Sequence, residues 1–266
     1  MIQEPLHRTR ATDRSPAGSA VWADVVALIP ALDEENALPG VIRGLRAEGV
    51  SRVLVVDNGS TDRTEQVARA EGAVVVREEE RGYGAACLEG LREIDRRGWT
   101  PEVILFLDGD GSDDPGALSS LVAPVLAGSA DLVIGIRGEA GRPSQEVPPH
   151  ARLGNALVLG GARVLHGMWA TDLGPFRAVR SEALRRLEMD DRNWGWTLQM
   201  QLRAHHAGLK VREVDVPHRP RQGGRSKVSG SLTGSLRAGS KMLLTLLTEL
   251  PQLRRLRSRR ADGDSA

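Results

Sequence analysis

The feature that most constrains the fold is an alternation of short apolar runs with longer helical segments, which begins at Val25. The runs are rich in β-branched residues and largely apolar, a pattern typical of strands buried on both faces of a parallel sheet. Segments of helix length separate the runs, and several of them end in glycine, as a C-terminal cap does. Repeated strand–helix–strand units therefore predict an α/β domain with a mostly parallel sheet. The predicted strands are residues 25–29, 52–56, 73–76, 103–107 and 132–136.

The second half of the chain is predicted to continue the same domain. A polar stretch rich in Gly and Pro follows Arg137 and is expected to be mobile. Further elements are predicted as helices at about 151–165 and 196–207, an extended piece near 174–179, a strand at 211–216 and an amphipathic helix from about Ser231. We therefore divide the chain into a flexible leader (1–22), one α/β domain (23–250) and a basic disordered tail (251–266).

Charge and cysteine content exclude several classes of protein. The 266 residues include 36 Lys and Arg against 35 Asp and Glu, a net charge of +1, which argues against a dedicated nucleic-acid binder. The single cysteine, Cys87, excludes an internal disulfide framework and a cysteine-rich zinc site, and we interpret it as a small core residue. The apolar segment 242–250 is too short to span a bilayer. A cytoplasmic protein is expected, with peripheral membrane contact left open because residues 254–260 are strongly basic.

Three of the predicted strands run into acidic loops. Residues 33–35, 57–62 and 108–114 each contain two or more carboxylates directly after a strand. Ligands of open α/β sheets bind beyond the carboxyl ends of the strands, so these loops are expected to meet at one edge of the sheet. Their negative charges would repel one another unless a cation or hydrogen-bond donors compensate.

The loop after the fourth strand is the most informative of the three. Asp108 and Asp110 are two residues apart in an extended segment, so their side chains can point the same way, and Gly109 and Gly111 allow a ligand to approach the backbone. Two hard oxygen ligands suit Mg²⁺ or Mn²⁺ completed by phosphate oxygens. A calcium-binding EF-hand is excluded, because its pattern requires Gly at 113 and Glu at 119. A solvated acidic turn, in which Asp114 caps the following helix, remains the alternative.

A glycine-rich segment follows the third predicted strand. Residues 82–87, GYGAAC, are one residue short of the GxGxxG dinucleotide fingerprint and do not follow the first strand, so NAD binding is not predicted. A glycine-rich helix start that lines a nucleotide pocket is the interpretation that we retain.

Six segments in order carry a family resemblance: IPALDEEN, VVDNGSTD, RGYGAACLEGL, FLDGDGSDDP, TDLGPFRA and RQGGRSKVSG. This set resembles the GT-A glycosyltransferases of family 2, closest to the branch of dolichyl- and polyprenyl-phosphate mannosyl- and glucosyltransferases. The resemblance covers residues 25–247. It implies a GT-A fold and a metal-dependent, inverting transfer of a hexose from a nucleotide-diphosphate sugar to a polyprenyl phosphate, with Mg²⁺ or Mn²⁺ as cofactor.

The resemblance also implies roles for individual residues. The nucleotide would contact Pro30, Leu32, Glu34, Asp57, Asp108 and Gly109, with Asp57 accepting a hydrogen bond from the base. The metal would lie at Asp108 and Asp110, with Ser112 where relatives often carry a glutamine ligand. Arg221 and Lys227 belong to a loop whose cations meet phosphates. The acceptor's phosphate would be bound by Arg137, Arg152 and Asn155.

Two departures from the family keep a second function open. The chain has no predicted membrane-spanning segment, and Gln199 stands where many similar sequences carry glutamate. Both favour a soluble family 2 enzyme that acts on a hydroxyl of a small molecule or cell-wall precursor. A hydroxyl acceptor needs a general base, for which Asp172 is the first candidate and Asp190 or Asp191 the next.

Single features of the sequence leave further interpretations open. A catalytically inactive nucleotide-binding scaffold and a nucleotidyltransferase are the remaining alternatives, and a homo-oligomer is left open. Trp194 and Trp196 are expected either to pack in the core or to line the sugar or acceptor pocket. His205 and His206 lack a third ligand at metal spacing and are assigned to surface or packing roles.

Overall fold

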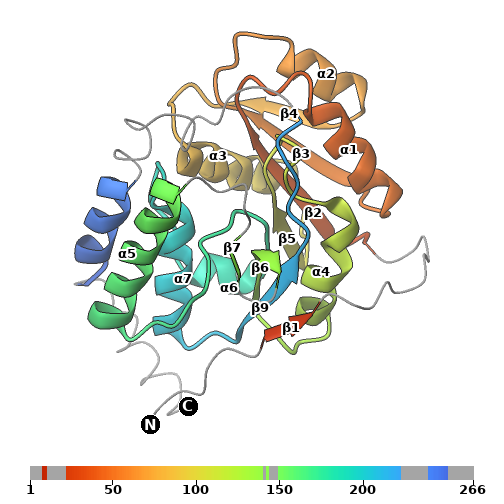
Figure 1. Ribbon diagram of the computed structural model, residues 1–266. Helices are drawn as coiled ribbons and strands as arrows, with labels where there is room; N and C mark the ends of the chain where they lie inside the picture. The colour runs from red at the N-terminus through yellow and green to blue at the C-terminus, as the bar shows by residue number, and fades with distance from the viewer. Residues whose placement is uncertain (1–7, 11–21, 140–141, 144–148, 223–238, 251–266) are drawn as a thin grey trace.

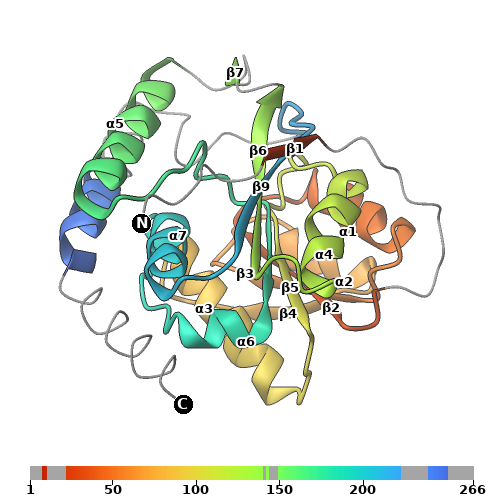
Figure 2. The same ribbon diagram turned by 90° about the horizontal axis from the view of Figure 1, so that it is seen from below.

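The computed structural model describes residues 8–10, 22–139, 142–143, 149–222 and 239–250 (Figure 1). A central sheet is covered by helices on both faces, as the perpendicular view shows (Figure 2). The strands are β1 (Arg8–Arg10), β2 (Val25–Ala31), β3 (Arg52–Asp57), β4 (Val74–Arg77), β5 (Val103–Phe106), β6 (Leu132–Glu139), β7 (Arg142–Pro143), β8 (Arg177–Arg180) and β9 (Val211–Val216). The helices are α1 (Leu38–Ala47), α2 (Thr64–Ala70), α3 (Tyr83–Arg96), α4 (Leu118–Leu126), α5 (Pro149–His166), α6 (Ser181–Arg186) and α7 (Trp196–Ala207). A 3₁₀ turn, Pro115–Ala117, precedes α4, and residues 239–250 are also helical.

The sheet order among the described strands is β1-β9-β6-β8-β5-β2-β3-β4, with β7 paired to β6. Strands β2, β3, β4 and β5 are parallel neighbours, and β6 is parallel to β9. Strand β8 is antiparallel to both β5 and β6 and joins the two parallel groups. The prediction of a mostly parallel α/β sheet is confirmed, and each of the five strands predicted in the first half is present.

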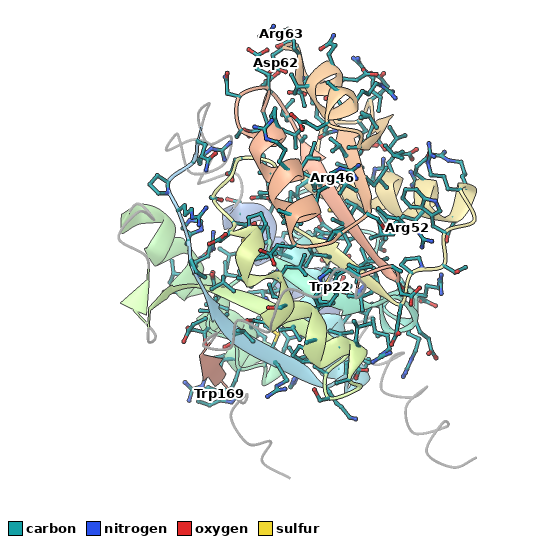
Figure 3. The ribbon with its side chains drawn as sticks, turned by 90° about the vertical axis from the view of Figure 1, so that its right-hand side faces the viewer. Trp22, Arg46, Arg52, Asp62, Arg63 and Trp169 are labelled. Atoms are coloured by element: carbon teal, nitrogen blue, oxygen red, sulfur yellow. The ribbon has the colours of Figure 1, made fainter. Side chains whose placement is uncertain are left out.

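Side chains of the strands alternate between two core clusters, which explains why their sequences are apolar throughout. In β2, Val25, Ala27 and Ile29 pack on one face with α1 and α4, and Trp22 covers the same cluster (Figure 3). Val26 and Leu28 of the same strand pack on the other face with α3 and α7. Cys87 is fully buried in this second cluster, as expected for a small core residue.

A third cluster attaches two further helices to the outer side of α7. Val158 and Ala162 of α5 and Leu246 of the helix at 239–250 pack on Leu198 and Leu202 of α7. The two outer helices lie side by side (Figures 1 and 2), and His166 Nε2 lies 2.8 Å from the carbonyl oxygen of Leu246. None of the described helices is long and apolar enough to cross a membrane.

The predicted leader needs one correction. Residues 8–10, inside the segment expected to be flexible, form β1 and pair in parallel with β9. An edge strand exposes unpaired backbone groups, and pairing with a short segment satisfies them. Trp22, the last residue of the predicted leader, is described as well and packs against the first core cluster. Residues 1–7 and 11–21, most of the stretch expected to be mobile after Arg137, the first residues of the last predicted helix and the basic tail lie outside the described residues.

Candidate active site

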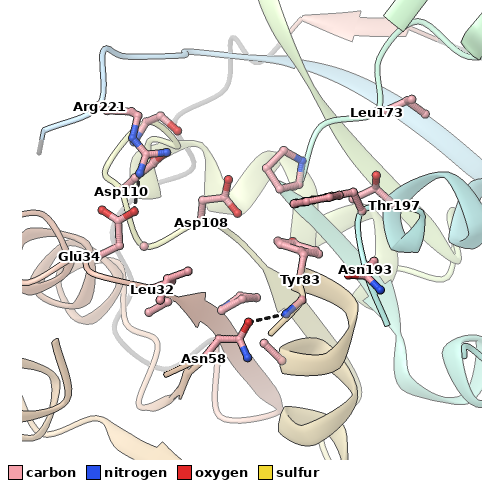
Figure 4. A pocket seen from close by; sticks show the side chains of 18 of the residues that line it. Leu32, Glu34, Asn58, Tyr83, Asp108, Asp110, Leu173, Asn193, Thr197 and Arg221 are labelled. Carbon is pink, nitrogen blue, oxygen red and sulfur yellow. Dashed lines mark hydrogen bonds and ion pairs between the residues drawn. The ribbon is translucent and has the colours of Figure 1, made fainter. Parts of the chain in front are cut away.

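A pocket of about 800 Å³ opens beyond the carboxyl ends of β2, β3 and β5 (Figure 4). Its lining comes from the loops after these strands, from the start of α3, from residues 173–175 and 193–197, and from residues 218–221. The start of α3 contributes Gly82 and Tyr83, so the glycine-rich segment lines the pocket as predicted. The acidic loops after β2 and β5 meet here as well, as the parallel sheet requires.

The loop after β5 folds into a tight turn around two carboxylates. The backbone N–H of Ser112 donates to Asp110 Oδ1 at 2.8 Å, and the N–H of Asp108 donates to Asp113 Oδ2 at 3.1 Å. Gly111 has a φ of +76°, a conformation that glycine adopts without strain. The loop therefore holds Asp108 and Asp110 at the pocket wall, together with Gly109 and Ser112.

Burial and mutual repulsion perturb the carboxylates of this turn. Burial raises the pKa of Asp108 well above its ordinary value, and the charges of Asp110 and Asp113 raise it further. Burial, with a further contribution from Asp110, also raises the pKa of Asp113 to about 7. The alternative of a solvated turn is wrong, because Asp110 is only 4% exposed, although Asp114 does cap the following turn through the N–H of Gly116 at 3.0 Å.

The donor set of this turn fits a hard divalent cation. Within the described residues Asp113 Oδ1 is buried without a hydrogen-bond partner, so the turn has negative charge that its own donors do not satisfy. No group of three or more His, Cys, Asp or Glu side chains in the described part of the chain makes a complete metal site. One or two carboxylates completed by water and substrate phosphate are what Mg²⁺ uses, so Asp108 and Asp110 are the residues that would hold it.

Arg221 connects this turn to the chain that follows β9. Its Nη1 lies 2.6 Å from Asp110 Oδ2, and its Nη2 pairs with Glu34 in the loop after β2. The backbone is fixed as well, because the N–H of Gln222 donates to the carbonyl of Asp110 at 3.0 Å and that of Arg219 donates to Ser112 at 2.9 Å. The fold thus places the guanidinium of Arg221 against Asp110, one of the predicted metal ligands. Lys227, its expected companion, lies outside the described residues.

Arg137 reaches the pocket from β6 and is held by Asp172. Its Nε and Nη2 each lie 2.8 Å from an oxygen of the Asp172 carboxylate. Burial works to raise the pKa of Asp172, but the charge and hydrogen bonds of Arg137 outweigh it, so the pKa lies below its ordinary value. A carboxylate with both oxygens bound and a depressed pKa is a poor general base. Asp172 does not line the pocket; Arg137 does.

The remaining predicted residues divide into those the pocket contains and those it does not. Pro30, Leu32, Glu34 and Asn155 line it. Asp57 does not: it is buried, and its Oδ1 accepts a hydrogen bond from the N–H of Ser60 at 2.8 Å. The side chain of Arg152 lies outside the described residues. Asp190 and Asp191, the next candidates for a general base after Asp172, do not line the pocket either. Asp190 pairs with Arg203, and Asp191 pairs with Lys241.

The two tryptophans take different roles. Trp194 lines the pocket, whereas Trp196 is fully buried and packs near Phe106 with ring centroids 6.2 Å apart. Gln199, three residues further on, is buried away from the pocket lining and hydrogen-bonds the loop before α7. His206 is buried beside His166, with ring centroids 5.5 Å apart, in agreement with a packing role.

Several pocket residues were not identified from the sequence. Asn58 could have been found from the sequence, because it follows Asp57 directly at the end of a predicted strand. Its Oδ1 accepts a hydrogen bond from the N–H of Gly82 at 2.8 Å, which connects the end of β3 to the start of α3. The apolar residues Leu173, Pro175, Trp194 and Met242 come from distant parts of the chain. Of these, Trp194 was named from the sequence as a residue that could line the pocket, and the other three were not.

Comparisons with known proteins agree with this geometry. Residues 26–188 match the model of Glycosyl transferase family 2. Over 214 residues the chain is 42% identical to an uncharacterized glycosyltransferase of Mycobacterium tuberculosis, covering 80% of this chain and 93% of the relative. Over 221 residues it is 32% identical to an undecaprenyl-phosphate mannosyltransferase of Micrococcus luteus, covering 79% of this chain and 89% of that protein.

A solved structure supports the fold. Glucosyl-3-phosphoglycerate synthase from Mycobacterium tuberculosis, crystallised with Mn²⁺ and uridine-diphosphate-glucose, superimposes with a TM-score of 0.70 at 22% identity. The match covers 94% of this chain and 88% of that chain. The resemblance drawn from the sequence motifs is confirmed: the chain belongs to glycosyl transferase family 2 and is a glycosyltransferase with the GT-A fold.

Proposed function

We propose that the chain transfers a hexosyl group, with inversion, from a nucleoside-diphosphate sugar to the phosphate of a polyprenyl phosphate. The observation that carries this proposal is that the pocket lining holds two unlike sets of residues. The charged side is the turn with Asp108 and Asp110 together with Arg221. Leu173 lies across the pocket from Arg221 (Figure 4), and with Trp194 and Met242 it makes up the apolar residues that we call the apolar side. The charged side suits a diphosphate with its cation, and the apolar side suits an acceptor that carries hydrocarbon.

The charged side would bind the donor. Asp108 and Asp110 would hold Mg²⁺ or Mn²⁺, and the bound cation would neutralise charge on the departing diphosphate. Arg221 is already at this position and would contact the same phosphates. Support comes from the glucosyl-3-phosphoglycerate synthase crystallised with Mn²⁺ and uridine-diphosphate-glucose, whose fold this chain shares.

A phosphate acceptor agrees with the engagement of all three carboxylates that were expected as bases. Asp172 is bound by Arg137 through both oxygens, and Asp190 and Asp191 are engaged elsewhere. A phosphate monoester is largely dianionic near neutral pH, because its second pKa is about 6, so its oxygen can attack without losing a proton. In the transfer, the bond from the anomeric carbon to the acceptor oxygen forms as the bond to the diphosphate breaks. Arg137 would orient the acceptor phosphate, and the nucleoside diphosphate would leave.

The name of the Micrococcus luteus relative, undecaprenyl-phosphate mannosyltransferase, supports a polyprenyl phosphate acceptor. The second candidate is transfer to a small phosphorylated acceptor, because crystal structures of the mycobacterial synthase include one with phosphoglyceric acid. That acceptor would react through a hydroxyl and would require a base other than these three carboxylates, for which His218 in the described lining is the candidate.

Purified protein with a panel of nucleotide sugars would test the proposal. Release of nucleoside diphosphate is measured with Mn²⁺, with Mg²⁺ or with EDTA, and with no acceptor, a short-chain polyprenyl phosphate or phosphoglyceric acid. We expect release that needs both a divalent cation and the polyprenyl phosphate. Release with phosphoglyceric acid and none with the polyprenyl phosphate would overturn the proposal in favour of the second candidate.

A further inference from the structure

The two outer helices carry an apolar surface that faces away from the protein. Within the described residues, the exposed large hydrophobic side chains all come from α5, the turn after it and the helix at 239–250. Val164 is 83% exposed, Leu157 60% and Leu247 57%. We call this set the outer apolar face: Leu157, Val164, Leu165, Trp169, Leu243, Leu244, Leu247 and Leu250.

The packing of the helices explains why these side chains share one face. Val158, Ala162 and Leu246 point inward to α7 and form the third core cluster. The exposed positions of the second helix recur at spacings of three and four, at Leu243, Leu247 and Leu250, so they lie along one stripe opposite the buried one. Trp169 lies at the periphery of the molecule (Figure 3). Exposed apolar residues that were scattered singly over the surface would not form a stripe of this kind.

The same segments contain basic residues but almost no acidic residues. Residues 149–170 contain no Asp or Glu, and residues 239–250 contain only Glu249, which is 2% exposed and bound by Arg203. Arg163 is exposed and stands over the Trp169 ring, with its guanidinium carbon 3.3 Å from the ring centroid. The sequence continues with arginine at 254, 255, 257, 259 and 260. An apolar stripe that lacks exposed carboxylates, has Arg163 beside it and is followed in the sequence by arginines matches an anionic lipid surface.

We propose that the outer apolar face docks on an anionic lipid bilayer. The face adjoins the acceptor side of the pocket, because Asn155 of α5 and Met242 of the helix at 239–250 both line that pocket. A bilayer on this face would present lipid-borne phosphate beside the pocket mouth. The link to catalysis rests on the proposed function, whereas the docking itself does not.

Vesicle flotation of the full chain tests the docking. The probes are phosphatidylcholine vesicles with and without phosphatidylglycerol, and the variant is Val164→Glu/Leu247→Glu, which places charge on the face at two exposed positions. Its matched control is Gln66→Glu/Ala70→Glu, at two exposed positions on α2. We expect the wild type and the control to float with anionic vesicles and the face variant to partition at least about tenfold less.

Two outcomes would overturn the docking proposal: no flotation of the wild type at low salt, or equal flotation of the wild type and the face variant. A concentration-dependent dimer that the face variant abolishes, in a protein that does not float, would instead assign the face to a second copy of the chain. Circular dichroism of each variant would show that the fold is retained.

Activity measurements separate this inference from the proposed function. With a water-soluble short-chain polyprenyl phosphate the face variant should match the wild type, and with long-chain acceptor in anionic vesicles it should be slower. If neither protein uses any polyprenyl phosphate but flotation still depends on the face, the proposed function fails and the docking surface stands.

Discussion

Arg221 Nη1 lies 2.6 Å from Asp110 Oδ2, which joins a residue of the chain after β9 to the acidic turn after β5. The same guanidinium pairs with Glu34, in the loop after β2. One cation therefore neutralises carboxylates from two strand ends. These carboxylates lie at the position where a divalent cation and a diphosphate would bind. Arg221 therefore pairs with Asp110 before the donor binds and would contact the diphosphate afterwards.

Replacing Arg221 with glutamine should separate these two roles. Without nucleotide, Asp110 loses a competing cation, and Mn²⁺ should bind about tenfold more tightly, because a charge pair this close contributes more than about 1.4 kcal/mol at the dielectric of a protein surface. Turnover should fall, because the diphosphate loses a contact. Titration calorimetry and nucleoside diphosphate release measure the two effects. Arg43→Gln, which removes an exposed arginine of α1, is the control. An unchanged Mn²⁺ affinity would show that Arg221 does not compete for Asp110.

Much of the fold could be predicted because its strands are buried on both faces. Alternate residues of β2 enter two different cores, so the sequence from Val25 is apolar without interruption and stands out from the helices beside it. Strand β1 could not be predicted, because its three residues, two of them arginine, show no apolar pattern in the sequence. The antiparallel insertion of β8 depends on tertiary pairing that no local pattern specifies.

The charged side of the pocket was predictable, whereas on the apolar side Trp194 was the residue that the sequence indicated. Acidic residues directly after strands must meet at one edge of a parallel sheet, so Asp108, Asp110 and Glu34 follow from topology. Asp172 was expected to be a base, but the structure places Arg137 on it, a partner 35 positions away that the sequence does not indicate. Leu173 and Met242 resemble any core residue in the sequence, and only the fold brings them to the pocket.

The start of α3 should not tolerate a side chain at Gly84. A Cβ there would overlap the carbonyl oxygen of Asp191, in the loop that carries Asn193 and Trp194 to the pocket. We expect Gly84→Ala to lower the free energy of unfolding by about 1–3 kcal/mol, as overpacking does, and to weaken nucleotide-sugar binding. Gly160→Ala, in a helix with open space around the position, should be neutral or stabilising by up to about 1 kcal/mol. Urea unfolding compares the two, and equal stabilities would contradict the predicted overlap.

The ion pair of Asp172 and Arg137 should make stability depend on acid pH. The pKa of Asp172 is lower in the folded protein than in the unfolded chain, so the unfolded state binds more protons as the pH falls. The stabilisation is therefore complete above the unfolded pKa of about 3.9 and is lost as the pH falls through the folded value. Asp172→Asn should cost about 1–3 kcal/mol near neutral pH, because it takes a directly bonded counter-charge from the half-buried Arg137, and the difference from wild type should shrink below about pH 4.

Urea unfolding of both proteins across the acid range would measure this difference. Asp95→Asn, which removes an exposed carboxylate of α3, should leave the pH profile unchanged. A difference between Asp172→Asn and the wild type that stays constant down to low pH would contradict a depressed pKa at Asp172.

Gln199 should be required as an amide, because it lies between two carboxylates. Its Nε2 donates to Glu249 Oε1 at 2.7 Å and to Asp190 Oδ1 at 2.8 Å, while its Oε1 accepts from the N–H of Asp191 at 2.9 Å. Gln199→Glu would remove the donor and add a third carboxylate beside Arg203, so we expect a loss of about 2–4 kcal/mol. Adding Glu249→Gln returns the net charge and supplies a new amide, and it should recover part of the loss although Glu249→Gln alone destabilises. Unfolding of the four proteins gives the coupling energy by a double-mutant cycle, and additive effects would show that Gln199 and Glu249 do not act as a matched pair.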